Sequence, residues 1–263
     1  MHNAIDDKLA GLRRSGVHGM MNHIVIGYPD LAASERLLLT LADSGADLVE
    51  LQIPFTDPVA DGPTILKANL ASLKNGIRVR DCLAFAERMV KRLADTPLLF
   101  MTYVNIPFNY GIGAFCRDSA AAGLAGLIVP DIPPEEAAEN YHGLCLENGL
   151  HPVYILSPSS TDERMKLIGE RATGFLYATA RVGITGARDS RMAGLENFAT
   201  RLRKYVNVPL ALGFGLSSRE HVDEVKSPFD IAVIGSRVID LYNSGADEKA
   251  ALDAVSSFLR SLR

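Results

Sequence analysis

Eight short apolar segments recur along the chain, each separated from the next by a longer segment with helical periodicity. The segments begin near Met21, Asp47, Pro97, Ala125, His151, Gly174, Pro209 and Asp230 and read MNHIVIG, DLVELQI, PLLFMTYV, AGLIVPD, HPVYILS, GFLYATA, PLALGFG and DIAVIGS. Segments of this kind, alternating with helices, are typical of parallel strands joined by crossover helices. Because eight β/α units close on themselves, the sequence predicts an α/β fold of the (β/α)8 TIM barrel type.

Helix signals lie between these strands. Asp30 is a typical N-cap for a helix over residues 31–44, in which three leucines form one apolar stripe and which Gly45 ends. A second helix is expected over 133–148. An extra helix, at about 6–14 and ahead of the first strand, is expected to close the bottom of the barrel.

Length and composition agree with one barrel. A chain of 263 residues suits this fold, and its 48% apolar and 22% charged residues provide a large core without a disordered composition. We expect residues 1–263 to form a single domain. The net charge of -4 includes no basic cluster, so neither a nucleic-acid nor a membrane partner is indicated, and we expect a small-molecule substrate.

The three cysteines, Cys82, Cys116 and Cys145, are far apart and have no CxxC or Cys/His ligand spacing. We interpret them as free thiols in a reducing compartment. The first residues carry acids and no apolar core typical of a signal peptide, and no run of about 18 apolar residues indicates a membrane span. These features predict a cytoplasmic location.

Glu50 is an acidic residue inside a segment that otherwise reads as a buried strand. Apolar surroundings favour the protonated form of a carboxyl group, so Glu50 could hold a proton near neutral pH and act as general acid and base. A structural glutamate paired with a nearby cation is an equal alternative.

A proline-rich loop, residues 53–64, follows the Glu50 strand and contains Asp57 and Asp61. Asp61 precedes Gly62 and Pro63, and an aspartate there is more often a turn or cap residue than a catalyst. Its closeness to Glu50 in the sequence favours the catalytic interpretation. A second long connection, 181–194, follows the sixth strand, and barrel enzymes keep chemistry and lids at these strand ends.

The last two strands end in small residues, Gly213 and Gly215 after the seventh and Gly235 and Ser236 after the eighth. Small residues let backbone N–H groups approach an anion, and a helix N-terminus adds a positive dipole end. Loops after these two strands hold phosphate in many barrels.

The sequence lacks the residues that two other mechanisms would need. No lysine falls at the C-terminal end of an expected strand, so a Schiff-base mechanism would lack its nucleophile. No His/Asp/Glu cluster converges in the sequence, so we expect no catalytic metal. Carbon–carbon cleavage would have to rely on acid–base chemistry.

Seven motifs extend over nearly the whole chain. The longest is ELQIPFTDPVADGPTI, residues 50–65, and the others are GYP (27–29), MTYVN (101–105), LIVPDIPPEE (127–136), YATARVGITGAR (177–188), GFGLS (213–217) and IGS (234–236). In these motifs and in their order the chain resembles the alpha subunit family of tryptophan synthase. The most specific match is residues 50–65, which are similar to the family signature ELGxPFSDPxADGPxI.

This resemblance implies a carbon–carbon lyase that cleaves indole-3-glycerol phosphate into indole and glyceraldehyde 3-phosphate in tryptophan biosynthesis. Glu50 matches the general acid and base, Asp61 the carboxylate that engages the indole N–H, and Tyr177 an active-site tyrosine. Further matches at substrate-binding or lid positions are Tyr103, Arg181, Thr185 and Phe214, and matches at phosphate positions are Gly186, Gly213, Gly215, Gly235 and Ser236.

The resemblance also implies no cofactor in this chain and a partner beta subunit that carries pyridoxal phosphate, in an alpha2beta2 tetramer. The partner would dock over the open end of the barrel, near Asp57, Pro58 and Asn105.

Five residues depart from the family pattern: His23, Tyr28, Gln52, Ala180 and Val182. Gln52 replaces a usual glycine, and His23 occupies a usually aromatic position. His23 could line the pocket, but a satisfied core histidine is the favoured interpretation.

Two other functions stay open. Another phosphate-sugar barrel would share the small-residue loops but lack PFTDPVADGP, and a degenerate barrel could serve only as an allosteric scaffold. Intact Glu50 and Asp61 argue against the scaffold.

Overall fold

The computed structural model describes residues 2–135, 140–179, 188–213 and 215–263, with side chains omitted for 188–193. Its described residues form nine strands, all parallel to their neighbours, in one sheet of order β5-β4-β3-β2-β1-β9-β8-β7-β6. The strands are β1 (Gly19–Val25), β2 (Leu48–Gln52), β3 (Leu98–Met101), β4 (Gly126–Ile128), β5 (His151–Val153), β6 (Ile155–Leu156), β7 (Leu176–Thr179), β8 (Leu210–Gly213) and β9 (Ile231–Ile234).

The sheet closes through the short segment that contains β5 and β6. β5 pairs with β4, whereas β6 pairs with β7, so the two ends of the sheet belong to one stretch of chain. Tyr154 lies between the halves, and its carbonyl oxygen accepts a hydrogen bond of 3.0 Å from the backbone N–H of Tyr177. The eight predicted strands are therefore present, the fifth is divided in two, and the predicted barrel is confirmed.

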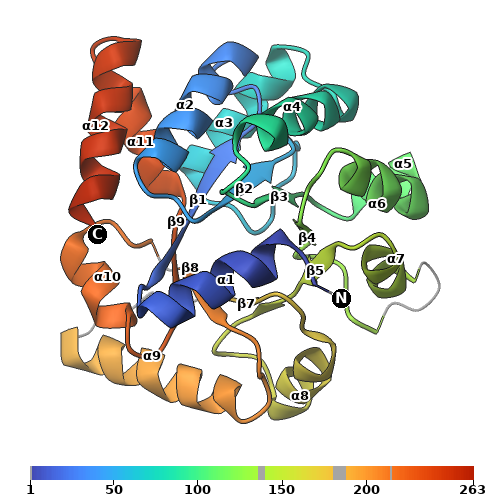
Figure 1. Ribbon diagram of the computed structural model, residues 1–263, viewed down its shortest axis with the longest axis vertical. Helices are drawn as coiled ribbons and strands as arrows, with labels where there is room; N and C mark the ends of the chain where they lie inside the picture. Colours follow the sequence, from blue (N-terminus) through green and yellow to red (C-terminus); the bar gives the residue numbers. More distant parts are fainter. Residues whose placement is uncertain (1, 136–139, 180–187, 214) are drawn as a thin grey trace.

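Helices surround this barrel (Figure 1). They are α1 (Ala4–Ser15), α2 (Leu31–Asp43), α3 (Pro63–Lys74), α4 (Val79–Arg92), α5 (Asn105–Tyr110), α6 (Ile112–Ala121), α7 (Tyr141–Glu147), α8 (Asp162–Arg171), α9 (Arg188–Arg203), α10 (Arg219–Val225), α11 (Ser236–Ser244) and α12 (Glu248–Ser261). Asp30 caps α2 as predicted, because its Oδ1 accepts a hydrogen bond of 2.8 Å from the Ala33 N–H.

Two predicted boundaries are wrong. The helix expected over 133–148 is helical in its described part only at α7, because residues 133–135 lie outside any helix and Asn140 has the left-handed φ of 46°. A right-handed helix cannot run through that conformation. The connection expected over 181–194 is shorter than predicted, since α9 already begins at Arg188.

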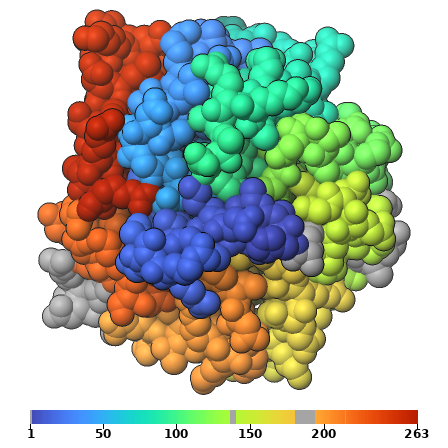
Figure 2. All heavy atoms as spheres, viewed as in Figure 1, coloured from blue at the N-terminus to red at the C-terminus, as the bar shows by residue number. Residues whose placement is uncertain are grey.

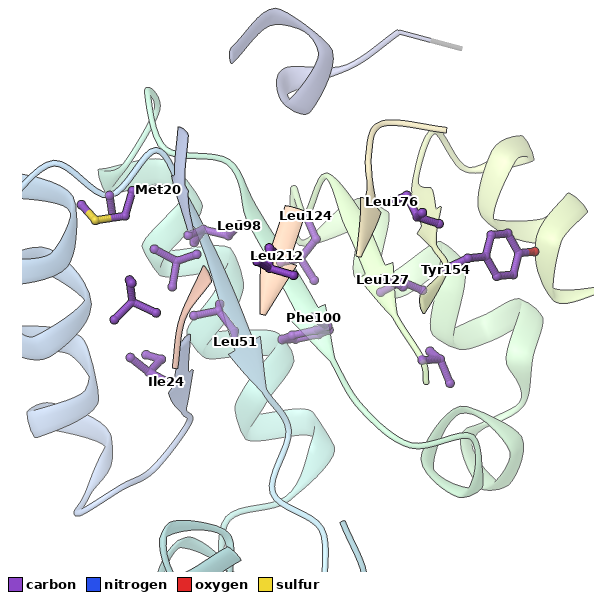
Figure 3. Packing of buried hydrophobic residues seen from close by; sticks show 14 of the residues in the cluster. Met20, Ile24, Leu51, Leu98, Phe100, Leu124, Leu127, Tyr154, Leu176 and Leu212 are labelled. Carbon is purple, nitrogen blue, oxygen red and sulfur yellow. The ribbon is translucent and has the colours of Figure 1, made fainter. Parts of the chain in front are cut away.

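Side chains on successive strand residues face opposite layers of the core. The outer layer, between strands and helices, includes Ile24, Leu51 and Phe100, which Figure 3 shows as sticks. The inner layer fills the barrel and includes Met21 and Leu48. The strands read as nearly continuous apolar runs because both layers are buried.

Helix α1 closes the barrel at the end where the strands begin, as predicted. Ile5 and Leu9 pack into the inner layer, and Ile5 is fully buried. The Asn3 side chain donates hydrogen bonds to the carbonyl oxygens of Ala125 at 2.8 Å and Gly149 at 2.9 Å, beside the starts of β4 and β5. Figure 2 shows these N-terminal residues, in blue, across the centre of this face.

The three cysteines are buried free thiols, as expected. In the described part of the chain no helix is both apolar and long enough to cross a membrane.

Because Ile5 fills the bottom of the barrel, we predict that Ile5→Ala lowers the free energy of unfolding by about 3 kcal/mol, the usual cost of truncating a buried aliphatic side chain. Val17 is 45% exposed near the same end, so Val17→Ala should cost less than about 1 kcal/mol. Urea unfolding would measure both, and equal losses would contradict the proposed packing role of α1.

Candidate active site

A cavity of about 950 Å³ lies where the strands end, opposite α1. Its described lining includes the predicted site residues Glu50, Asp61, Tyr177, Gly213, Gly215, Gly235 and Ser236, and also His23. A second cavity, of about 740 Å³, lies beside α1 and α10 and contains none of these residues. The barrel thus brings together residues as far apart in the sequence as His23 and Ser236.

The alternation along β2 directs Glu50 into the barrel. Leu48 belongs to the inner layer, whereas Val49 and Leu51 belong to the outer layer, so Glu50 and Gln52 continue the inward row above Leu48. The inner row is therefore apolar at the bottom and polar at the top. This places the Glu50 carboxylate at the cavity floor with 4% of the residue exposed.

His23 on β1 lies directly across from Glu50 in the strand register. Its Nδ1 is 3.2 Å from Glu50 Oε1, and both side chains are buried. Burial lowers the pKa of His23, but the charge and hydrogen bond of Glu50, with the charge of Asp61, outweigh this and raise the pKa above its ordinary value. The cation pairing that the sequence left open for Glu50 is therefore available, and it occurs inside the cavity.

The favoured interpretation of His23 as a satisfied core histidine is wrong. His23 lines the cavity, and its Nε2 is buried with no hydrogen-bond partner among the described residues. Sequence periodicity could not distinguish these cases, because core and cavity floor share the same inward row. Tyr28, another departure, instead reaches α11, where its hydroxyl donates to Asn243 Oδ1 at 2.8 Å.

Asp61 lies in the loop after β2, and two side chains donate hydrogen bonds to it. Gln52 Nε2 donates to Asp61 Oδ2 at 2.6 Å, and the Tyr103 hydroxyl donates to the same oxygen at 3.0 Å. Burial, followed by the charge of Asp61, raises the pKa of Tyr103, so this hydroxyl keeps its proton. The Tyr103 oxygen also accepts a hydrogen bond from Ala60 N–H at 3.2 Å, and its ring stacks on Phe55 with centroids 5.4 Å apart.

Tyr177 approaches Glu50 from β7. Its hydroxyl is 3.5 Å from Glu50 Oε1, and burial, followed by the charge of Glu50, raises its pKa well above the ordinary value. Gly213 makes room for this ring, because a Cβ there would lie 2.7 Å from Tyr177 Cε1. The structure thus gives a steric reason for a glycine at position 213, which the sequence analysis missed. The predicted contact of Gly213 with phosphate stays a prediction.

The part of the cavity lining beside His23 includes small residues and a helix end. Gly215 has φ +61°, which favours glycine, and a Cβ there would meet nothing within 4 Å. Gly235 and Ser236 lie at the start of α11. The first N–H groups of a helix have no intrahelical acceptors, so this end suits an anion.

The expected residues Arg181, Thr185, Gly186 and Phe214, and the departures Ala180 and Val182, lie outside the described residues. Cavity residues that the sequence analysis did not single out include Ile65, Pro130, Ser157, Ser159, Thr179, Arg237 and Asp240. The sequence could have indicated Ser157 and Thr179, because both are polar residues at the ends of expected strands. Within the described ranges, no group of three or more His, Cys, Asp or Glu residues could hold a metal ion.

Residues 9–262 match the family model described as tryptophan synthase alpha chain. The chain belongs to this family. The tryptophan synthase alpha family comprises lyases that act on indole-3-glycerol phosphate in tryptophan biosynthesis.

Relatives named tryptophan synthase alpha chain agree over nearly the full length. One from Syntrophotalea carbinolica is 46% identical over 244 residues, covering 93% of this chain and 94% of the relative, and one from Desulfotalea psychrophila is 43% identical, covering 93% of each. The crystal structure of tryptophan synthase subunit alpha from Legionella pneumophila has a TM-score of 0.91 at 30% identity, covering 100% of this chain and 97% of that one. A chain of Mycobacterium tuberculosis tryptophan synthase has a TM-score of 0.88 at 30% identity, with the same coverage.

Proposed function

We propose that this chain cleaves indole-3-glycerol phosphate into indole and glyceraldehyde 3-phosphate, with Glu50 as general acid and base. The observation that carries the proposal is that Glu50 and Asp61 line one cavity whose lining also includes small residues and a helix N-terminus. The two carboxylates suit the indole part of the substrate, and the helix N-terminus, which attracts anions, suits its phosphate.

The chemistry needs a proton in two places. The bond between indole C3 and the adjacent glycerol carbon breaks, C3 gains a proton, and the hydroxyl on that carbon loses one as it becomes the aldehyde. One group that accepts and returns a proton satisfies both steps, without a net oxidant or reductant. Glu50 is the buried carboxyl group proposed for this role.

Asp61 would accept the indole N–H as positive charge develops on the ring. Gln52 and Tyr103 both donate to Oδ2, and no described residue donates to Oδ1. Oδ1 is therefore the oxygen proposed to face the indole. Tyr177 would complete the wall beside Glu50.

The phosphate is proposed to bind where Gly215, Gly235 and Ser236 line the cavity and α11 begins. Gly213 is proposed as a neighbour of the same site, and Arg181, Thr185, Gly186 and Phe214 as residues that complete it.

The family implies a beta-subunit partner. We propose that this partner carries the pyridoxal phosphate, that the chain has no cofactor of its own, and that the assembly is an alpha2beta2 tetramer. Docking over the open end is supported by two apolar side chains near the loops after β2 and β3, Val59 at 78% and Phe108 at 59% exposed. A single domain over 1–263 and a cytoplasmic location belong to the same proposal.

We predict that Glu50→Gln abolishes indole release while substrate binding persists, because the amide keeps the shape of the side chain but cannot carry the proton. Asp61→Asn should reduce kcat by at least about a hundredfold. Indole would be assayed after adding indole-3-glycerol phosphate to the purified proteins, and near-normal release by Glu50→Gln would contradict the proposal. No release by the natural protein, even with a beta subunit, would favour the scaffold alternative.

For the phosphate site, we predict that Gly215→Val raises KM by at least about tenfold with a smaller change in kcat. The side chain would strain the backbone at φ +61° and enter the cavity. Gly16 offers a control, since it has φ +64° and equally open surroundings but caps α1 at the other end of the barrel. Gly16→Val should leave KM unchanged, and an equal KM for both variants would contradict the phosphate placement.

For the partner, we predict at least tenfold stimulation of cleavage by a beta-type subunit, equivalent to about 1.4 kcal/mol of activation free energy. Docking would order the loop that carries Asp61 and so raise its competent fraction. Because Gln52 already holds Asp61, Gln52→Gly should lower the activity of the isolated chain and increase the stimulation. Full activity without the partner, unchanged on its addition, would contradict this prediction.

A further inference from the structure

His23 is a buried ionisable residue of the cavity for which the proposed chemistry has no role so far. It is 3% exposed, lines the cavity, and lies beside Glu50. A buried histidine is costly unless its contacts stabilise it. The main such contact is the one with Glu50, and Gln52 adds a weaker one.

Both described donors to Glu50 approach the same oxygen. His23 Nδ1 lies 3.2 Å from Oε1, and the Tyr177 hydroxyl lies 3.5 Å from Oε1. Within the described part of the chain, no side chain donates to Oε2. The two carboxylate oxygens of Glu50 therefore differ, one held by the protein and one open to the cavity.

We propose that His23 is a positioning residue that acts through Glu50: its Nδ1–H donates to Oε1, fixes the carboxylate, and leaves Oε2 as the oxygen that exchanges protons with the substrate. The inference rests on the proposed function, because it assigns a helper to the acid and base of that reaction. The proton on Nδ1 stays on His23 throughout, and Oε2 alone takes the hydroxyl proton and returns a proton to indole C3. No additional reactant is required.

The charge of His23 gives this role a pH signature. The charged and titratable groups that face the pair are Glu50 on β2, Asp61 in the loop after it, and Tyr177 on β7. An imidazolium donates its Nδ1–H to a carboxylate more strongly than a neutral imidazole does. Because the pKa of His23 is raised, removing this residue should change the activity profile above about pH 6.5, where the natural protein loses that charge.

Two substitutions separate the hydrogen bond from the charge. His23→Phe restores the aromatic type usual in the family and removes both. His23→Asn retains a neutral N–H near the position of Nδ1 but removes the charge. We expect His23→Phe to lower kcat by at least about tenfold with less than about threefold change in KM, and to change the profile above about pH 6.5. His23→Asn should recover most of kcat on the pH plateau while keeping the changed profile.

His151 is the matched control. It is 1% exposed and lies 2.9 Å from Asp6, so it is a second buried histidine beside a carboxylate, but at the closed end of the barrel. His151→Asn should change stability without changing the pH profile of kcat. If all three variants lowered kcat alike with unshifted profiles, His23 would have a structural role only, and the proposal would be overturned. The same holds if His23→Phe kept the natural kcat and profile.

A second measurement does not depend on catalysis. Because the pKa of His23 is raised on folding, its stabilising contribution is complete below its ordinary value of about 6.5 and is lost as pH rises through the raised value. The free energy of unfolding of the natural protein minus that of His23→Asn should therefore fall as the pH rises above about 6.5. A flat difference would overturn the pairing. A falling difference in a protein without lyase activity would keep the pairing and reject the proposed function.

Discussion

A closed parallel barrel has an interior that every strand must fill with alternate side chains. This constraint determines what β2 can do, because Leu48 must pack at the bottom and Glu50, two residues later, must point into the same interior higher up. Helix α1 packs Ile5 into the bottom of the interior, and the cavity that contains Glu50 lies at the other end, where the strands end. The place of the cavity and of its buried carboxylate depends on that packing.

A buried carboxylate needs donors, and the barrel provides them from several strands. Glu50 receives His23 from β1 and Tyr177 from β7, while Asp61 receives Gln52 from β2 and Tyr103 from the chain after β3. Desolvation of these charges is costly, and the cost is offset only when the donors are held in place by the surrounding sheet. Loosening of β2, which carries both Glu50 and Gln52, would therefore weaken both carboxylate positions. The geometry of the site therefore depends on the same sheet packing that stabilises the barrel.

Much of this arrangement was predictable from local patterns. The strands, the extra N-terminal helix and the capping of α2 by Asp30 follow from periodicity and turn chemistry, which act over a few residues. The helix expected over 133–148 failed because composition does not reveal the left-handed backbone of Asn140. His23 was misinterpreted because its neighbours in the sequence are apolar. What distinguishes it is Glu50 on the adjacent strand, a contact set by register.

By itself, the sequence determined the fold class, the family, and the residue types available for acid–base chemistry. These depend on the hydrophobic pattern and the order of the motifs, which are both properties of the residue order alone. The tertiary structure decided which oxygen each donor reaches, that Gly213 is small to admit Tyr177, and that His23 and Glu50 form a buried pair. The physical reason is that hydrogen bonds and ion pairs act over about 3 Å, whereas Glu50 and Tyr177 are brought to that range only by closing a sheet across more than a hundred residues.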